Sequence, residues 1–268
     1  MKNYYGKLCA ETYEVLHAEA PEDELAFYFS YAHAGDKILE PMCGSGRFLI
    51  PFMERGFDIA GIDLSEEMLS ALYRKAPRAH AFKGDIPKFD SDAPCDYIFI
   101  SSGSFSLFTD EGAADRVLVK LRSLLAPGGK TVIAAESMAG AHNGDGSYRL
   151  VSAIPLDDGG ELRFSSMDHY DAKTQAQHSP GRYELYRDGE PAESEWMDFQ
   201  IRLYRFGELE QRLERAGFAS GRRIALLIGS PRKGIWTRCF SMSARLGELP
   251  ALSLVVGGVY RASRRSWL

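Results

Sequence analysis

Cysteine, histidine and long apolar runs are scarce in this sequence, and each shortage excludes a class of protein. The 268 residues include four cysteines and six histidines, none at the short spacing that zinc ligands or a C-x-x-C pair require. We therefore expect no metal site and no disulfide framework. No apolar run reaches the length of a membrane-spanning helix, and the first residues lack the apolar core of a signal peptide. These shortages predict a cytoplasmic protein with reduced thiols and no membrane partner.

Negative charge predominates outside the C-terminal end of the chain. The net charge is −5, yet residues 221–268 contain nine Lys or Arg against one acidic residue, so this end carries +8 and the rest −13. A body this acidic repels polyanions, and nucleic acid is not expected as its partner. The basic end after Gly229 has two interpretations: a surface arm for an anionic partner, or a terminus translated from a shifted reading frame.

Short apolar segments alternate with amphipathic ones through the first half of the chain. Helices are expected between the strands and at residues 206–216. The expected strands are residues 37–41, 58–63, 78–83, 96–100, 130–136, 223–228 and 252–260. This alternation predicts an α/β fold with a Rossmann-like, doubly wound sheet of seven mostly parallel strands.

The alternation stops between residues 137 and 204. Turn signals at 157–160 and 187–191 separate stretches of period-two patterning, which predicts three or four antiparallel strands. We therefore expect residues 1–136 and 205–268 to form one ligand-binding domain. Residues 137–204 are expected to form an inserted antiparallel β lid that contacts the substrate.

A glycine-containing turn follows the first expected strand, in the pattern Glu40-x-x-x-Gly44-x-Gly46. Ligands of doubly wound sheets bind beyond the carboxyl ends of the strands, where glycine lets the backbone approach them closely. Asp63 ends the next strand, where its carboxylate can accept hydrogen bonds from two ribose hydroxyls. A dinucleotide fingerprint would need a small residue where Leu49 stands. Glu40 would also repel a diphosphate, whereas it suits a cationic amino-acid ligand.

Residues 37–136 and 206–218 resemble a class I S-adenosylmethionine (SAM)-dependent methyltransferase of the small-molecule type. The resemblance implies SAM as the cofactor and methyl transfer by in-line displacement from its sulfonium. It implies a cofactor site that runs from the methionine part through the ribose to adenine and the floor under the sulfonium. The residues are Tyr13, Glu40, Cys43, Gly44, Gly46, Asp63, Leu64, Met68, Gly84, Asp85, Ile86, Ser101 and Ser102.

One departure from the family pattern is the bulk of Met42 and Cys43, where many members have Asp or Gly. Cys43 has two interpretations, a nucleophile or a small apolar residue packed in the turn. Packing is favoured because no basic residue that would activate a thiol is near in sequence.

The acceptor side carries weaker signals. His169 is a candidate general base at neutral pH, in a run of titratable residues from Asp168 to Asp171. Alternatively, His169 lies on a solvated strand edge and has no catalytic role. Phe105, Tyr170 and Arg149 are candidate substrate contacts, with Arg149 suited to a carboxylate.

Three functions remain open at this point. The favoured one is methyl transfer to a small-molecule substrate by a monomer or homodimer. The second is a non-catalytic SAM-binding sensor or scaffold. A dinucleotide-binding oxidoreductase is the least favoured, because the turn after the first strand departs from its fingerprint.

Overall fold

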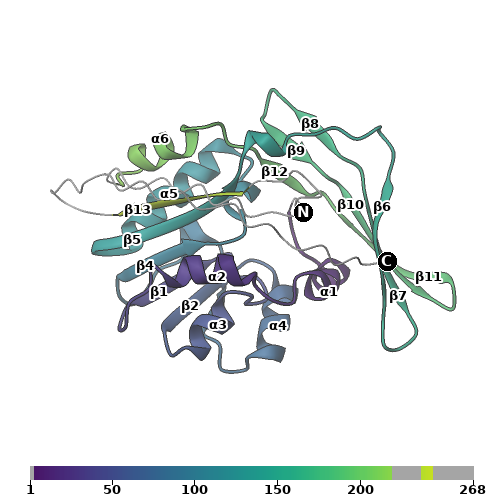
Figure 1. Ribbon diagram of the computed structural model, residues 1–268, viewed down its shortest axis with the longest axis horizontal. Helices are drawn as coiled ribbons and strands as arrows, with labels where there is room; N and C mark the ends of the chain where they lie inside the picture. Colours follow the sequence, from purple (N-terminus) through teal and green to yellow (C-terminus); the bar gives the residue numbers. More distant parts are fainter. Residues whose placement is uncertain (1–2, 219–236, 244–268) are drawn as a thin grey trace.

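Five parallel strands form the centre of the protein (Figure 1). The computed structural model describes residues 3–218 and 237–243. An additional strand, β13 (Thr237–Ser243), runs antiparallel along β5, and the sheet order is β13-β5-β4-β1-β2-β3. The parallel strands are β1 (Lys37–Pro41), β2 (Asp58–Asp63), β3 (Ala81–Lys83), β4 (Cys95–Ile100) and β5 (Leu125–Glu136).

The predicted number of seven strands is wrong for the described sheet, which has six, five of them parallel. The strand beside β5 comes from Thr237–Ser243, where the sequence predicts none because adjacent Cys239 and Phe240 break a period-two alternation. The expected strands 223–228 and 252–260 lie outside the described residues, as does most of the basic end.

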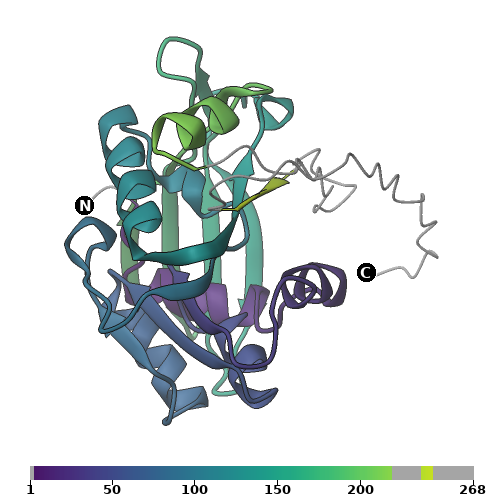
Figure 2. The same ribbon diagram turned by 90° about the vertical axis from the view of Figure 1, so that its left-hand side faces the viewer.

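Helices cover both faces of the sheet (Figure 2). One face carries α2 (Glu22–Phe29), α3 (Leu49–Glu54) and α4 (Glu66–Lys75), and the other carries α5 (Glu111–Leu124) and α6 (Glu208–Arg215). Adjacent strand residues alternate between the two cores, so Ile38 packs with the first set of helices and Leu39 with the second. Short 3-10 turns follow two strands: η1 (Ile86–Lys88) after β3 and η2 (Phe105–Leu107) after β4.

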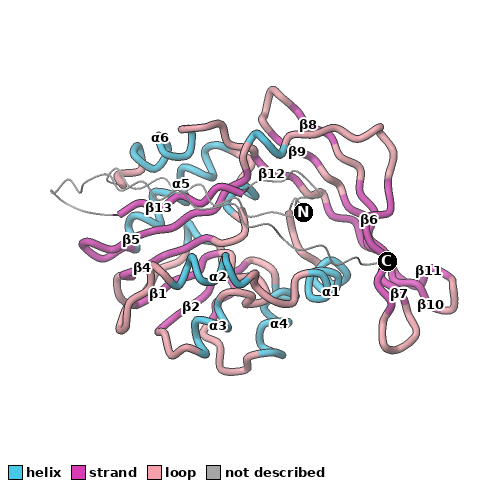
Figure 3. Tube along the Cα trace, in the orientation of Figure 1, coloured by secondary structure: helices cyan, strands magenta, loops and turns pink. Residues whose placement is uncertain are grey.

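Seven strands lie between β5 and α6, in two antiparallel sheets that we call the insertion (β6–β12, residues 149–202). Figure 3 shows that this part consists of strands and loops, entered through one short turn, η3 (Met138–Gly140). The first sheet is β11 (Glu190–Met197), β10 (Gly181–Arg187), β7 (Glu161–Ser166) and β6 (Arg149–Pro155). The second is β12 (Gln200–Arg202), β9 (Ala176–His178) and β8 (His169–Asp171). The prediction of three or four strands was too low because strands of three residues are too short to show a period.

Helix α1 (Lys7–Leu16) packs against the insertion rather than on the parallel sheet (Figure 1). Its residues Leu8 and Cys9 share an apolar cluster with Tyr183 of β10 and Met197 of β11. An ion pair of 2.7 Å between Glu14 and Lys75 joins the other side of α1 to α4. None of the helices in the described part of the chain is both long and apolar enough to span a bilayer.

Candidate active site

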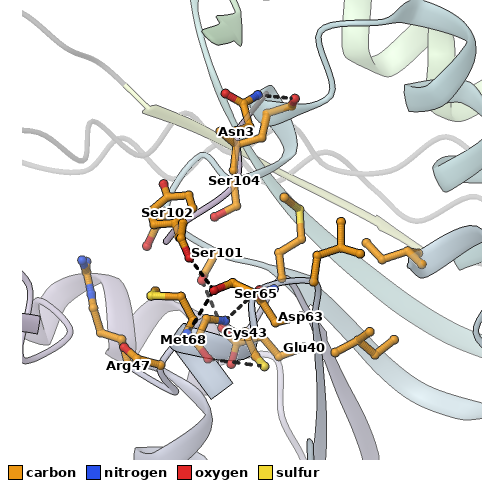
Figure 4. Close-up of a pocket in the computed structure, with 18 of the residues that line it drawn as sticks. Asn3, Glu40, Cys43, Arg47, Asp63, Ser65, Met68, Ser101, Ser102 and Ser104 are labelled. Atoms are coloured by element: carbon orange, nitrogen blue, oxygen red, sulfur yellow. Dashed lines mark hydrogen bonds between the residues drawn. The ribbon is translucent and has the colours of Figure 1, made fainter. Parts of the chain in front are cut away.

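A cavity of about 270 Å³ opens at the carboxyl ends of β1, β2 and β4 (Figure 4). Its wall combines the turn after β1, the ends of the next strands and the residues that precede α1. Every predicted cofactor residue except Gly46 lines it. These are Tyr13, Glu40, Cys43, Gly44, Asp63, Leu64, Met68, Gly84, Asp85, Ile86, Ser101 and Ser102.

The turn after β1 depends on backbone conformations that favour glycine. Met42, Gly44 and Gly46 all have positive φ, at 62°, 52° and 83°. A Cβ on Gly46 would lie 2.3 Å from Leu72 of α4. Gly46 therefore lets the turn pack on α4, and it shapes the cavity without lining it.

Asp63 joins the turn to the start of α4. Its carboxylate accepts the N–H of Gly44 at 2.8 Å and the N–H of Ser65 at 2.9 Å. The hydroxyl of Ser65 in turn accepts the N–H of Met68 at 3.0 Å and so caps α4. Burial raises the pKa of Asp63, while the backbone N–H groups act in the opposite direction by stabilising the carboxylate.

Glu40 is a buried carboxylate that the protein satisfies only in part. Its Oε1 accepts the hydroxyl of Ser101 at 3.1 Å, and its buried Oε2 has no hydrogen-bond partner among the described residues. Burial raises the pKa of Glu40 well above its usual value, and the charge of Asp63 raises it further. A cation placed in the cavity would satisfy this oxygen.

Three more buried polar atoms of the same wall have no partner among the described residues: Ser45 Oγ, Arg47 Nε and Ser102 Oγ. Arg47 reaches Glu24 of α2 at 3.5 Å, and Glu24 also accepts the N–H of Ser102 at 3.1 Å. Because buried polar atoms are normally hydrogen-bonded, four unpartnered ones on one wall indicate a polar ligand. A guanidinium and two hydroxyls beside a carboxylate match a zwitterion, in which ammonium and carboxylate lie close together.

The residues before α1 cover the cavity. The hydroxyl of Tyr4 donates to Glu67 at 2.6 Å, and the carbonyl of Tyr5 accepts the hydroxyl of Ser65 at 2.7 Å. The Asn3 amide group donates to the carbonyls of Leu107 and Gln200 at 2.9 and 2.8 Å and accepts the N–H of Gln200 at 2.7 Å. The segment Asn3–Gly6 therefore connects the insertion with both η2 and α4.

Cys43 is buried in the turn, and burial raises the pKa of its thiol well above the usual value. The charges of Asp63 and Glu40 raise it further, so the thiolate that a nucleophile needs is disfavoured. A Cβ on Gly61 of β2 would lie 2.5 Å from the Cys43 sulfur. These contacts support the packing interpretation of Cys43.

Comparison with known proteins agrees with this geometry. Residues 38–129 match a family model described as "Methyltransferase domain". Over these residues the chain is similar to methyltransferase domains. Putative methyltransferase YqeM of Bacillus subtilis (strain 168) is 41% identical over 68 residues, 25% of this chain and 27% of that protein. The dTDP-4-amino-2,3,4,6-tetradeoxy-D-glucose N,N-dimethyltransferase of Saccharopolyspora spinosa is 31% identical over 96 residues, 36% of this chain and 39% of that protein. The chain thus spans between a quarter and two fifths of the curated relatives it matches.

Solved structures resemble this protein over most of its length. An S-adenosylmethionine-dependent methyltransferase from Clostridium acetobutylicum ATCC 824 has a TM-score of 0.69 at 15% identity, covering 88% of this chain and 97% of that one. SAM-bound CalS10, an amino pentose methyltransferase from Micromonospora echinaspora, has a TM-score of 0.66 at 17% identity, covering 91% and 99%. At these identities the likeness establishes the shared fold, including the strands inserted after β5.

The predicted acceptor-side residues lie outside the cavity wall. None of Phe105, Arg149, His169 and Tyr170 is among the described residues that line the cavity. Phe105 is fully buried in the core. His169 is exposed opposite His178, Arg149 pairs with Asp145, and the Tyr170 hydroxyl contacts the Met138 sulfur at 3.3 Å. Their roles in substrate binding or catalysis stay predictions.

Sequence reasoning missed several residues of the cavity wall. Arg47 directly follows Gly46, so its place in the turn was a signal that it belongs to the site. Asn3 also lines the cavity, and Glu24 holds Arg47 from behind. These two come from elements before β1, where no local motif marks them. Within the described residues, no three His, Cys, Asp or Glu side chains cluster closely enough to hold a metal ion.

Proposed function

We propose that this protein is a methyltransferase and that it transfers a methyl group from SAM to the amino group of a small molecule such as an amino sugar. The observation that carries the donor half is the buried, unpartnered Oε2 of Glu40. An ammonium group bound there would gain a charge-assisted hydrogen bond, whereas a dinucleotide diphosphate would be repelled. Arg47, Ser45 and Ser102 would hold the carboxylate of the methionine part.

The rest of the cavity suits the nucleoside part of SAM. The Asp63 carboxylate, at the end of β2, can accept from ribose hydroxyls. Leu64 is 56% exposed at this wall and offers an apolar surface to a planar base, with Asp85 beside it to accept from an exocyclic amine. When bound, SAM supplies a methyl group already activated by its sulfonium, so the protein's own contribution is orientation and exclusion of water.

The choice of an amine as methyl acceptor rests on which general bases line the cavity. Its described residues include no His and no Lys, and burial holds the Cys43 thiol in its neutral form. Its carboxylates, Glu40, Asp63 and Asp85, lie at the strand ends assigned to the donor. An unprotonated amine attacks without a protein base, whereas a sugar hydroxyl needs one. Similarity to amino-sugar methyltransferases points to the same acceptor class.

Calorimetric titration with SAM and S-adenosylhomocysteine (SAH) tests the donor half. We expect both SAM and SAH to bind. If neither binds, the donor assignment is wrong. Release of SAH is then measured with paired nucleotide sugars that carry either an amino or a hydroxyl group at the same carbon. Turnover with the amino member alone supports the proposal, and turnover with the hydroxyl member alone overturns the acceptor class. Binding with no turnover of any amino acceptor would favour a sensor or scaffold.

A further inference from the structure

The first turn of α1 is held by a side chain from the insertion. The carboxylate of Glu195, on β11, accepts the N–H of Leu8 at 2.9 Å and the N–H of Cys9 at 3.4 Å. The residue at the N-cap position, Gly6, has no side chain to accept these bonds. A carboxylate at a helix N-terminus satisfies free N–H groups and interacts favourably with the helix dipole. Glu195 therefore takes the place of a local cap.

Gly6 is shaped to admit this carboxylate. A Cβ on Gly6 would lie 2.6 to 2.8 Å from the carboxyl atoms of Glu195, closer than a real contact permits. The backbone of Gly6 is in an ordinary extended conformation, with φ −79° and ψ −168°, which any residue can adopt. The glycine is thus required by the approach of Glu195 and not by backbone strain.

Helix α1 and the segment before it carry three tyrosines of the cavity wall. Tyr13 lies on the helix, and Tyr4 and Tyr5 precede it. The same helix is fixed to the insertion, where Leu8 and Cys9 pack with Tyr183 and Met197. The position of these tyrosines over the cavity therefore depends on how the insertion holds α1.

We propose that Glu195 is a positioning residue that couples the insertion to the cofactor cavity through the N-terminus of α1. It touches no ligand, and it acts by placing Tyr4, Tyr5 and Tyr13 over the bound cofactor. Through this link, displacement of β11 shifts the wall of the cofactor cavity. The proposal rests on the proposed function for the identity of the cofactor, and on contacts within the chain for the coupling itself.

A double-mutant cycle tests the proposal, with Glu195→Ala, Gly6→Ala and the double variant compared by SAH titration. Loss of a helix cap is expected to weaken SAH binding about tenfold in each single variant. The double variant should bind no worse than Glu195→Ala alone, because the added methyl group then meets no carboxylate. Single variants that bind like the wild type, or effects that multiply in the double variant, would overturn the proposal.

The control is Glu193→Ala on the same strand. Glu193 forms an exposed ion pair of 2.7 Å with Lys7 of α1 but bonds no backbone N–H of the helix. Its removal should change SAH affinity less than twofold. If Glu195→Ala does not fold, Glu195→Gln replaces it in the test. This variant keeps one acceptor oxygen, so its SAH affinity should lie between those of the wild type and Gly6→Ala.

Hydrogen exchange without ligand separates this proposal from the proposed function. The amides of Leu8 and Cys9 should exchange about tenfold faster in Glu195→Ala and in Gly6→Ala, and at the wild-type rate in Glu193→Ala. Unchanged exchange would overturn the coupling even if SAH binds. If exchange accelerates but the wild type binds no SAH, the proposed function fails while the hold of Glu195 on α1 stands.

Discussion

Polar side chains have different surroundings in the cofactor cavity and in the insertion. In the cavity, Glu40, Ser45, Arg47 and Ser102 each keep a buried polar atom without a partner among the described residues. On the outer surface of the insertion, charged groups pair with each other in solvent, as Arg187 does with Asp158 at 2.8 Å. The cavity thus retains unused capacity for a ligand, whereas these surface pairs are satisfied. The insertion also has buried polar atoms without a partner among the described residues, at Ser152, Gln177, Arg182 and Arg202. These lie on four separate strands, whereas the four atoms of the cavity gather on one wall.

The largest expected effect in the cavity is that of Asp63→Asn. The amide keeps one acceptor oxygen and turns an NH2 group toward a backbone N–H of Gly44 or Ser65. Loss of hydrogen bonds to a charged acceptor should weaken SAH binding about 100-fold by calorimetry, or about 2.7 kcal/mol. The control is Asp58→Asn, at the exposed start of the same strand. If both variants lose SAH affinity equally, the loss does not depend on the position of Asp63 in the cavity.

Gly61→Ala tests the packing beneath the cavity. The new methyl group would lie 2.5 Å from the Cys43 sulfur and 2.6 Å from Leu49. Such overpacking should lower the free energy of unfolding by about 2 kcal/mol in urea denaturation. Gly140→Ala is the matched change, because nothing lies within 4 Å of a Cβ there. If the double variant Gly61→Ala/Cys43→Ala regains part of the lost free energy of unfolding, the Cys43 sulfur is the atom that the new methyl group overlaps.

Glu40→Gln should act in opposite directions on stability and on binding. The neutral amide avoids burying a charge, so the melting temperature of the free protein should rise by about 4 °C. The same change removes the charge that an ammonium group needs, and SAH affinity should fall about tenfold, or about 1.4 kcal/mol. Glu66→Gln, at an exposed pair with Lys83, should change neither. Tighter SAH binding by Glu40→Gln would contradict the assigned role.

The raised pKa of Glu40 also predicts a pH dependence. The folded free protein keeps this proton at pH values where the unfolded chain has released it. The stability that the group contributes is therefore present below the unfolded pKa and lost as the pH rises through the folded pKa. Binding of an ammonium group needs the ionised form, so SAH affinity should fall on acidification through the same range. In Glu40→Gln, SAH affinity should not change with pH over this range. If it changes as much as in the wild type, Glu40 is not the cause of the pH dependence.

The smallest effect is expected on the insertion side of the comparison. His169 is exposed and outside the cavity wall, so His169→Ala should change kcat/KM less than twofold in the SAH-release assay. Tyr170→Phe, one residue along the same strand, is the companion variant. General acid–base catalysts contribute about 100-fold or more. A loss of that size in His169→Ala would support His169 as the predicted base and place acceptor chemistry in the insertion.

The parts of the site that the sequence predicts are those built by neighbouring strand ends. Glu40, Asp63 and Asp85 each follow an apolar strand, and parallel strands bring their carboxyl ends to one edge. Local order along the chain was therefore sufficient to place them. The run from Asp168 to Asp171 also gathers titratable groups in sequence, yet it leads into the edge strand β8, where His169 is exposed and its neighbours are half-buried. Proximity in sequence does not determine which way a short edge strand faces.

The parts that sequence reasoning could not predict depend on contacts between distant segments. Asn3 bonds to Gln200, 197 positions along the chain, and Glu24 of α2 accepts the N–H of Ser102, which follows β4. Strand β13 was missed for a similar reason, since it is defined by its pairing with β5 more than by its own alternation. No period or motif encodes such pairings.

The contacts of Asn3 and Leu8 also determine when the cavity can be completed during synthesis. The Asn3–Gln200 bond spans 197 positions and the Leu8–Glu195 bond spans 187. Contacts this distant form late, because the long loop between them must close first. A ribosome that has released residues 3–136 has delivered the parallel strands but not Glu195 and Gln200, the partners of the N-terminal residues in the insertion. The nascent chain should therefore hold an open cofactor cavity until β11 and β12 emerge.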